Sequence, residues 1–233
     1  MMWCLVLVGL VEMASVSPGP PLAFREVREK DELPLKDLHG DCITEITYPT
    51  DFFFKATHGC EGIAGWVCTA GEAGEERLIG FVTAQVQDAS SNNVEEGIAD
   101  CVLRPTLWNW AQDNKFVYVL TIGVKEEYRG RGVATRLLNE VKRFGERRCA
   151  SAVYLHTIVY NHKAISFYRK NNFVCQKKLQ GFYRLNDTEV HDGLLFSCSK
   201  GSDYPDSSWD QCSLVPPQLW SILEGFFQSL KKA

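Results

Sequence analysis

The sequence predicts a single α/β domain, and three observations support this prediction. The chain has 233 residues, which suits one domain with terminal appendages. Its residues are 45% hydrophobic and 12% aromatic, enough to bury a substantial core. Strand-like and helix-like hydrophobic patterns alternate along the chain, and one strand leads through a glycine-rich turn into a helix.

Charge and cysteine content argue against several other classes of protein. With 25 Lys and Arg against 29 Asp and Glu, the formal net charge is −4, so general binding to nucleic acid is not expected. The nine cysteines are an odd number with no C-x-x-C pair and no clustered histidines, unlike a disulfide scaffold or a zinc site. We interpret them as reduced thiols of a protein facing the cytosol, with no metal centre.

Residues 1–21 form an apolar and proline-rich N-terminal extension. The apolar run is interrupted by Glu12 before the roughly 18 residues that a bilayer span requires, and no basic leader precedes it. We favour a peripheral extension or an uncertain start site over a secretion signal. The prolines and glycine of 17–21 break the chain, so the folded domain is expected to begin at Leu22.

At the other end, residues 200–215 have the Ser, Asp and Gly content of a linker, and 216–233 are expected to form an amphipathic helix. Its broad apolar stripe comprises Leu219, Ile222, Leu223, Phe226, Phe227 and Leu230. Two interpretations remain open. The stripe docks onto the domain's own core, or it lies in a membrane interface with Trp220 and the terminal lysines as anchors.

The first half of the domain contains four predicted elements before a long insertion. Residues 23–27 alternate like a strand, and 35–46 fit one or two short helices. Residues 65–69 and 78–86 resemble two antiparallel strands joined by a turn-rich segment. The polar and aperiodic stretch 88–115 is interpreted as an insertion loop.

The segment from 116 onward is the most informative. Residues 116–124 have the β-branched and aromatic content of a buried strand, and a helical face starts at Val133 and is expected to end at Gly145. Between them lies Arg129-Gly130-Arg131-Gly132. Glycines, the free amides at a helix start and two arginines suit a pyrophosphate, although an ordinary connector has the same composition.

Two familiar phosphate loops do not fit this turn. A P-loop requires Lys followed by Ser or Thr after its last glycine, but Val133 and Ala134 stand there. A dinucleotide fingerprint requires Gly or Ala at its sixth position, which is Thr135 here. Binding of NAD is therefore not expected.

A second strand and helix follow. Residues 152–158 read as a strand, Asn161 is a natural N-cap, and Ala164, Ile165 and Tyr168 fall on one helical face. Here the chain resembles the GNAT acetyltransferase superfamily. The resemblance lies in Ile122-Gly123-Val124, in the R-x-x-G-x-A element Arg129/Gly132/Ala134, and in the stretch 161–173.

The resemblance implies a GNAT domain over 22–199, with a mixed, mainly antiparallel sheet splayed around acetyl-CoA and flanked by helices. It implies acetyl-CoA as cosubstrate, direct transfer through a ternary complex, and no metal. The implied coenzyme-binding residues are Ile122, Gly123, Val124, Arg129, Gly130, Arg131, Gly132, Val133, Ala134, Thr135, Asn161, Tyr168, Arg169, Lys170 and Asn171.

Within this superfamily, the chain is most similar to the NatF-type N-alpha-acetyltransferases, which work at membranes. The matching segments are 46–49, 118–120, 154–156 and 181–183. The chain departs from that family at Glu45, where the family usually has proline, and in the 88–115 insertion, and both departures concern peptide specificity more than the chemistry. The resemblance implies the cytosolic face of an intracellular membrane, the Golgi or the plasma membrane, and otherwise the cytoplasm.

Tyr118 and His156 are the expected catalytic pair. Both are strand residues that would face the cleft between splayed strands, where His156 could accept a proton directly or through water and Tyr118 could join the relay. The alternative is that His156 caps a strand and Tyr118 packs in the core. Tyr168 either protonates the departing thiolate or packs beside the coenzyme.

The expected substrate is the N-terminal amine of proteins that begin with Met and an apolar or otherwise non-acidic residue. Tyr48, Leu120 and Tyr183 are the expected substrate-binding residues, with Phe182 as a further wall and Glu45 as a partner for the ammonium. A lysine or histone acetyltransferase is the alternative. A non-catalytic CoA-binding membrane adaptor is the alternative from another class.

Overall fold

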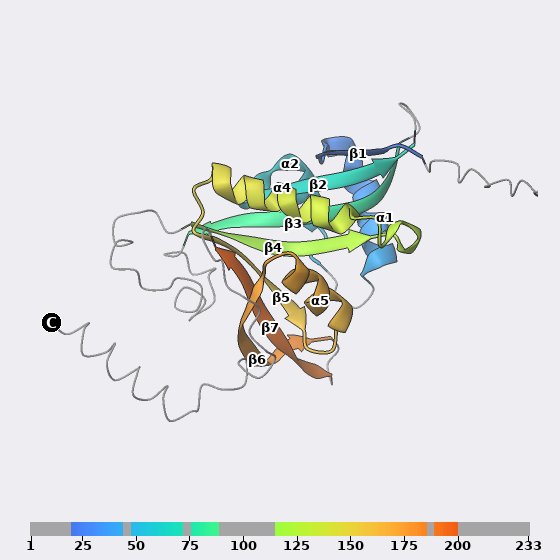
Figure 1. Ribbon diagram of the computed structural model, residues 1–233. Helices are drawn as coiled ribbons and strands as arrows, with labels where there is room; N and C mark the ends of the chain where they lie inside the picture. The colour runs from blue at the N-terminus through green and yellow to red at the C-terminus, as the bar shows by residue number, and fades with distance from the viewer. Residues whose placement is uncertain (1–19, 44–47, 72–75, 89–114, 186–188, 200–233) are drawn as a thin grey trace, which may run out of the picture.

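A computed structural model describes residues 20–43, 48–71, 76–88, 115–185 and 189–199 (Figure 1). The N-terminal extension up to residue 19, Glu45, most of the insertion, the linker and the amphipathic C-terminal segment lie outside these residues. The first described strand begins at Leu22 and the last ends at Ser199.

A seven-stranded sheet forms the centre of the molecule, in the order β1-β2-β3-β4-β5-β7-β6. All neighbours pair antiparallel except β4 and β5, which are parallel, so the predicted mixed, mainly antiparallel sheet is confirmed. The strands are β1 (Leu22–Glu26), β2 (Ile63–Ala70), β3 (Arg77–Asp88), β4 (Lys115–Val124), β5 (Ala152–Ile158), β6 (Val174–Arg184) and β7 (Val190–Ser199).

The two parallel strands part soon after they meet. Their pairing extends from Phe116↔Ala152 to Tyr118↔Tyr154, and both strands continue beyond it. On its other side β4 stays paired with β3, but the register shifts so that Leu120 is an extra residue between Val119 and Thr121. Such a bulge bends a strand and increases its twist, which favours the separation of β4 from β5.

Helices cover both faces of the sheet (Figure 1). Helices α4 (Val133–Arg147) and α5 (His162–Lys170) pack on one face, around Val82, Val117, Leu137 and Ile165. Helices α1 (Glu32–Cys42) and α2 (Phe52–His58) pack on the other, around Leu35, Phe53, Val67 and Phe81. Short 3-10 turns lie at Glu29–Asp31, Cys60–Gly62 and Glu126–Tyr128.

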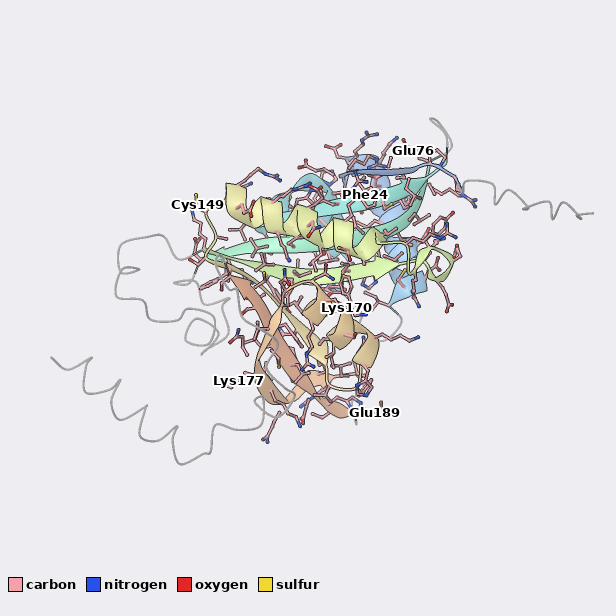
Figure 2. All side chains as sticks on the ribbon, in the orientation of Figure 1. Phe24, Glu76, Cys149, Lys170, Lys177 and Glu189 are labelled. Atoms are coloured by element: carbon pink, nitrogen blue, oxygen red, sulfur yellow. The ribbon has the colours of Figure 1, made fainter. Side chains whose placement is uncertain are left out.

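The prediction that Gly145 ends helix α4 was wrong. Gly145 is buried within the helix, where a Cβ at this position would be in ordinary contact with the side chains of Val153 and Val117, at 3.4 and 3.5 Å. The helix continues to Arg147, and the residue in the left-handed conformation is Cys149, with φ 55° (Figure 2). The Ala150 amide donates to the Gly145 carbonyl and the Cys149 amide to the Glu146 carbonyl, which completes a Schellman motif.

Other element boundaries differ from the expected ones by a few residues. Helix α1 begins at Glu32, ahead of the apolar pattern from Leu35 on which the prediction depended. Asp88 and Lys115 were assigned to the insertion, yet they pair with each other as the last residue of β3 and the first of β4. Hydrogen bonding to a neighbouring strand extends both strands past the end of their apolar residues.

Candidate active site

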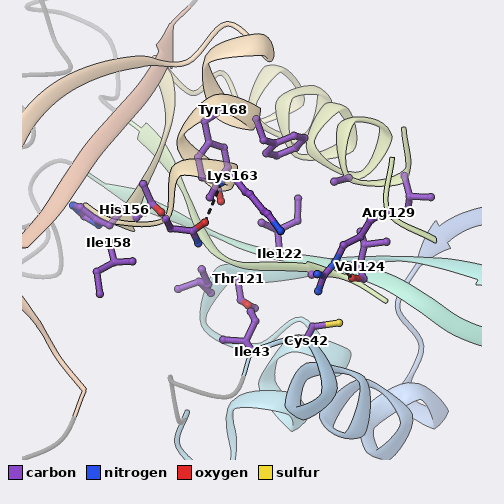
Figure 3. Close-up of a pocket in the computed structure, with 18 of the residues that line it drawn as sticks. Cys42, Ile43, Thr121, Ile122, Val124, Arg129, His156, Ile158, Lys163 and Tyr168 are labelled. Atoms are coloured by element: carbon purple, nitrogen blue, oxygen red, sulfur yellow. Dashed lines mark hydrogen bonds between the residues drawn. The ribbon is translucent and has the colours of Figure 1, made fainter. Parts of the chain in front are cut away.

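A cavity of about 900 Å³ opens where β4 and β5 part (Figure 3). This volume is within the range of small-molecule and cofactor sites. Residues from both faces of the sheet line it, including Ala134 and Tyr168 from α4 and α5 and Cys42 from α1. The gap between the strands therefore lets one cavity reach both sides of the sheet.

One wall of the cavity is the glycine turn that opens α4. Gly130 and Gly132 have φ values of 76° and 79°, and Gly132 is the N-cap of the helix. The first helical bond runs from the Arg136 amide to the Gly132 carbonyl, 3.0 Å, so the amides of residues 133–135 precede it. No atom lies within 4 Å of a Cβ built on either glycine, so a bulky anion can approach these amides.

The two arginines of this turn behave differently. Arg129 lines the cavity, and its Nε donates to the Val124 carbonyl at 3.0 Å, which fixes its stem beside the end of β4. Arg131 does not line the cavity. Its guanidinium lies over the Tyr128 ring, 5.3 Å from the centroid, in a cation–π contact.

Tyr118 and His156 meet where the two strands separate. The Tyr118 hydroxyl and Nδ1 of His156 are 3.1 Å apart, and the donor and acceptor roles follow the imidazole tautomer. Both side chains are half-buried and both line the cavity. Burial lowers the pKa of His156 from 6.5 to about 4, so its imidazole is neutral at pH 7.

Aromatic rings hold this pair in place. The Tyr118 ring stacks on Tyr154, with centroids 4.8 Å apart and planes at 18°, and the buried Tyr154 hydroxyl donates to Oε1 of Gln87. On the other side, the Phe182 ring lies 4.3 Å from the His156 ring. A Cβ on Gly193 would meet the Phe182 ring at 3.0 Å, so the glycine makes room for it.

Tyr48 closes the cavity on the α1 and α2 side. Its hydroxyl donates to the Leu120 carbonyl at 2.7 Å, and its ring stacks on Phe52 with centroids 4.2 Å apart. Burial raises the pKa of Tyr48 to about 12, so the phenol is protonated at neutral pH. Tyr183, on β6, lines the same cavity. An aromatic, largely uncharged mouth results.

Tyr168 lines the cavity from α5. Its side chain is buried next to the rings of Phe173 and Phe196. Burial raises the pKa of this phenol, which keeps it protonated at neutral pH and able to donate a proton or a hydrogen bond.

Most of the predicted site residues lie together around this cavity. The lining includes Tyr48, Tyr118, Leu120, Ile122, Gly123, Val124, Arg129, Gly130, Gly132, Val133, Ala134, Thr135, His156, Asn161, Tyr168 and Tyr183. The N-cap prediction for Asn161 is confirmed, because its side-chain oxygen accepts from the Ala164 amide at 3.1 Å.

Arg131, Arg169, Lys170 and Asn171 lie outside the cavity lining, and their role toward the coenzyme stays a prediction. Asn171 has structural contacts instead. Its side-chain amide donates to the Phe167 carbonyl at 2.8 Å, and its own carbonyl accepts from Nζ of Lys142 at 2.6 Å.

Sequence reasoning did not select several lining residues, which are Cys42, Ile43, Thr121, Tyr128, Thr157, Ile158, Lys163, Ala164, Phe167 and Leu185. Thr121, Thr157 and Ile158 follow from the parting of the strands, and Lys163, Ala164 and Phe167 from the face that α5 presents. The spacing of residues carries no signal for the parting of the strands, whereas the helical spacing of Ala164 and Tyr168 was a signal for the α5 residues. Within the described ranges, no three potential metal ligands come together, and no helix is both long and apolar enough to cross a membrane.

Comparisons with known proteins agree with this geometry. The model of the acetyltransferase (GNAT) family matches residues 35–173. A protein of Arabidopsis thaliana named histone acetyltransferase MCC1 is 31% identical over 209 residues, which cover 88% of this chain and 81% of the relative. The Danio rerio protein named N-alpha-acetyltransferase 60 is 25% identical over 123 residues, 51% of this chain and 48% of its own length.

Solved acetyltransferase structures are also similar to this chain. The crystal structure of Arabidopsis thaliana NAA60 in complex with acetyl-CoA superposes with a TM-score of 0.67 at 32% identity, covering 77% of this chain and 99% of that one. Arabidopsis thaliana Naa50, in complex with the bisubstrate analogue CoA-Ac-MVNAL, shares the fold at a TM-score of 0.57 and 22% identity, over 76% and 98% of the two chains.

Proposed function

This chain belongs to the GNAT family of acetyltransferases, and we propose that it transfers the acetyl group of acetyl-CoA to the N-terminal α-amine of proteins. One observation carries the proposal. The neutral Tyr118–His156 pair stands in the same cavity as the glycine turn of α4, between strands that have parted. The similarity to an NAA60 structure at 32% identity supports the choice of an N-terminal amine.

The residues of the cavity fit acetyl-CoA, which supplies an acetyl thioester when bound. The amides of Val133, Ala134 and Thr135 would hold the diphosphate at the positive end of the α4 dipole. The residues from Ile122 to Val124 and Asn161 line the path between this turn and the Tyr118–His156 pair. Tyr168 lies beside that path, where its phenol can act as a donor to the departing sulfur.

The proposed reaction needs a neutral amine and two proton transfers, one away from the amine and one to the departing sulfur. The amine nitrogen bonds to the acetyl carbon, the carbon–sulfur bond breaks, and the sulfur leaves as a thiolate. The amine releases a proton toward the Tyr118–His156 pair, and the thiolate takes up a proton, for which the phenol of Tyr168 in the cavity lining is the proposed donor.

The low pKa of His156, about 4, favours an α-amine over a lysine. An α-amine titrates near 7.7–8.0 and is roughly a tenth neutral at pH 7, whereas a lysine near 10.4 is neutral in less than about one part in a thousand. A weak base suits an amine that is already partly deprotonated. The mouth formed by Tyr48, Leu120 and Tyr183 suits a Met side chain followed by an apolar or non-acidic residue.

A panel of peptides with labelled acetyl-CoA tests this function. Peptides beginning Met-Leu and Met-Lys are expected to take label on the α-amine, and a Met-Asp peptide is expected to take much less. Tyr118→Phe and His156→Ala should each reduce turnover by about 10²-fold or more, the usual contribution of general base catalysis. Full turnover of both variants with unchanged coenzyme binding would contradict the relay.

A lysine acetyltransferase is the second candidate, since the relative covering 88% of the chain is named a histone acetyltransferase. The same panel separates the two, using a peptide with a blocked N-terminus and an internal lysine. Label only on that lysine would replace the proposed substrate. A wild-type protein that binds the coenzyme and labels no peptide would instead favour a non-catalytic adaptor.

We also propose that the enzyme works at the cytosolic face of an intracellular membrane such as the Golgi, on termini of membrane proteins. The amphipathic pattern of 216–233, outside the described residues, supports this. The full chain is expected to sediment together with liposomes, whereas a chain truncated at Ser213 is expected to stay in the supernatant. Equal pelleting of both would remove the membrane proposal.

A further inference from the structure

Lys163 is a cavity residue without an assigned role. It lies in the first turn of α5, and Figure 3 shows its side chain extending from the helix toward Ile122 on β4. The side chain therefore extends into the space between α5 and the parted strand (Figure 3). No ion pair joins it to a carboxylate among the described residues.

The charges of the cavity all have one sign. Arg129 and Lys163 line it, and among the described lining residues there is no Asp and no Glu. Arg129 directs its Nε to the Val124 carbonyl, so part of its donor capacity is already used. A cavity that has two cations and no carboxylate, next to a helix N-terminus, is electrostatically complementary to an anion.

We propose that Lys163 binds a phosphate group of the coenzyme and so makes coenzyme affinity depend on phosphate charge. This inference rests on the proposed function, because it takes acetyl-CoA as the occupant of the cavity. An ammonium on a flexible stem acts as a point charge that can follow a phosphate oxygen. Arg131, which the sequence also suggested for the phosphates, has its guanidinium over the Tyr128 ring and does not line the cavity.

The coenzyme offers two such anions, the diphosphate and the 3′-phosphate of the ribose. Three ligands distinguish them: CoA, dephospho-CoA, which lacks the 3′-phosphate, and pantetheine, which lacks both. Their dissociation constants are measured by calorimetry with the full chain, so the readout does not depend on turnover.

Lys163→Met keeps the apolar stem and removes the charge. We expect it to weaken CoA binding about 5- to 20-fold, an effect that added salt should reduce, and to leave pantetheine binding unchanged. If dephospho-CoA shows the same loss, the partner is the diphosphate. If dephospho-CoA binds both proteins equally, the partner is the 3′-phosphate.

Two further variants control for charge and structure. Lys163→Arg should restore most of the affinity for CoA, because the positive charge is kept. Lys36→Met removes an exposed lysine of α1, which is not part of the cavity lining, and should bind CoA like the wild type. It matches the change in net charge.

Equal CoA affinity of wild type and Lys163→Met would overturn the inference, as would an equal loss for pantetheine. Neither result affects the proposed function, which the peptide panel tests separately with the wild type. A wild type that binds no CoA would overturn both.

Discussion

His156 is half-buried, and its burial has a measurable cost in acid. Its pKa is about 4 in the folded protein against about 6.5 when exposed. Because the folded pKa is lowered, the neutral side chain stabilises the fold fully above pH 6.5, and this stability is lost as the pH falls toward 4. By linkage, the loss between pH 7 and pH 5 is about 2 kcal/mol.

Urea unfolding at pH 7 and pH 5 tests this expectation. His156→Gln removes the titrating group but leaves all others, including the buried His39, whose pKa is also lowered by burial. The variant should therefore lose about 2 kcal/mol less than the wild type between the two pH values. Equal losses would show that His156 is not buried in the neutral form.

Tyr154 allows stability and catalysis to be separated. Tyr154→Phe removes the hydroxyl that donates to Gln87 but keeps the ring that stacks on Tyr118. We expect a loss of about 1–3 kcal/mol in the free energy of unfolding, since the buried Gln87 oxygen loses that donor, with turnover within a few-fold of wild type. Tyr154→Leu, which removes the stack, should reduce kcat much more than KM. Equal kcat for both variants would contradict a positioning role of the ring.

At this scale, Tyr118 and His156 were predicted from the resemblance to a known family, and the structure brings both into the lining of one cavity. Strand alternation gives the face on which a side chain lies, but not the partner that it meets across two separating strands. Lys163 was not predicted. A lysine in the first turn of a helix has the same local pattern whether it faces solvent or a cavity, and only the packing of α5 decides between them.

The turn between β4 and α4 is an element whose geometry depends on glycine. Gly132 has φ 79° with open space around it, so Gly132→Ala is opposed by backbone strain alone, about 1–2 kcal/mol. The variant should unfold at lower temperature. It should also bind CoA more weakly, because a shifted N-cap moves the amides of residues 133–135.

Gly40→Ala is a control of opposite sign. Gly40 lies in helix α1 with no atom within 4 Å of an added Cβ, so alanine should stabilise the protein by about 0.5–1 kcal/mol. It should leave CoA affinity unchanged. If Gly132→Ala were as stable as the wild type, the left-handed conformation at the N-cap would be wrong.

Helix α4 shows which element boundaries the sequence can give. Its start at Val133 follows from the glycines, because a positive φ is a local property. Its end does not, since Gly145 has two possible uses, as a cap or as a contact. In the structure Gly145 contacts the sheet side chains Val117 and Val153, and Cys149 takes the left-handed position instead.

For the whole molecule, the parted strands predict that CoA binding stabilises the fold. Strands β4 and β5 pair over a short stretch, so a ligand in the gap would bridge the two parts of the sheet. At 100 times its dissociation constant, CoA should add about 2.7 kcal/mol, a rise of about 5–10 °C in Tm for a domain of this size. Pantetheine at the same multiple of its own dissociation constant should raise Tm by the same amount, because the stabilisation depends only on the ratio of ligand concentration to dissociation constant. An unchanged Tm at saturating CoA would contradict binding to the folded state.

The arrangement of the sheet came from the resemblance and not from hydrophobic patterns. Local patterns identified β1, β2, β3, β4 and β5 as strands, but they cannot say that β7 inserts between β5 and β6. That order depends on contacts between residues far apart in the chain. The bulge at Leu120 could not be predicted from the sequence either, because it is a register shift of β4 against β3.

The gap between β4 and β5 has a further consequence for kinetics. The glycine turn that opens α4 lies on the α4 side of the sheet, and Tyr48, at the aromatic mouth, packs on the α1 side. Acetyl-CoA and the peptide would then enter the cavity from opposite faces of the sheet, and neither would have to leave before the other binds. Inhibition by the product CoA should therefore be competitive with acetyl-CoA and should leave the affinity for a peptide unchanged.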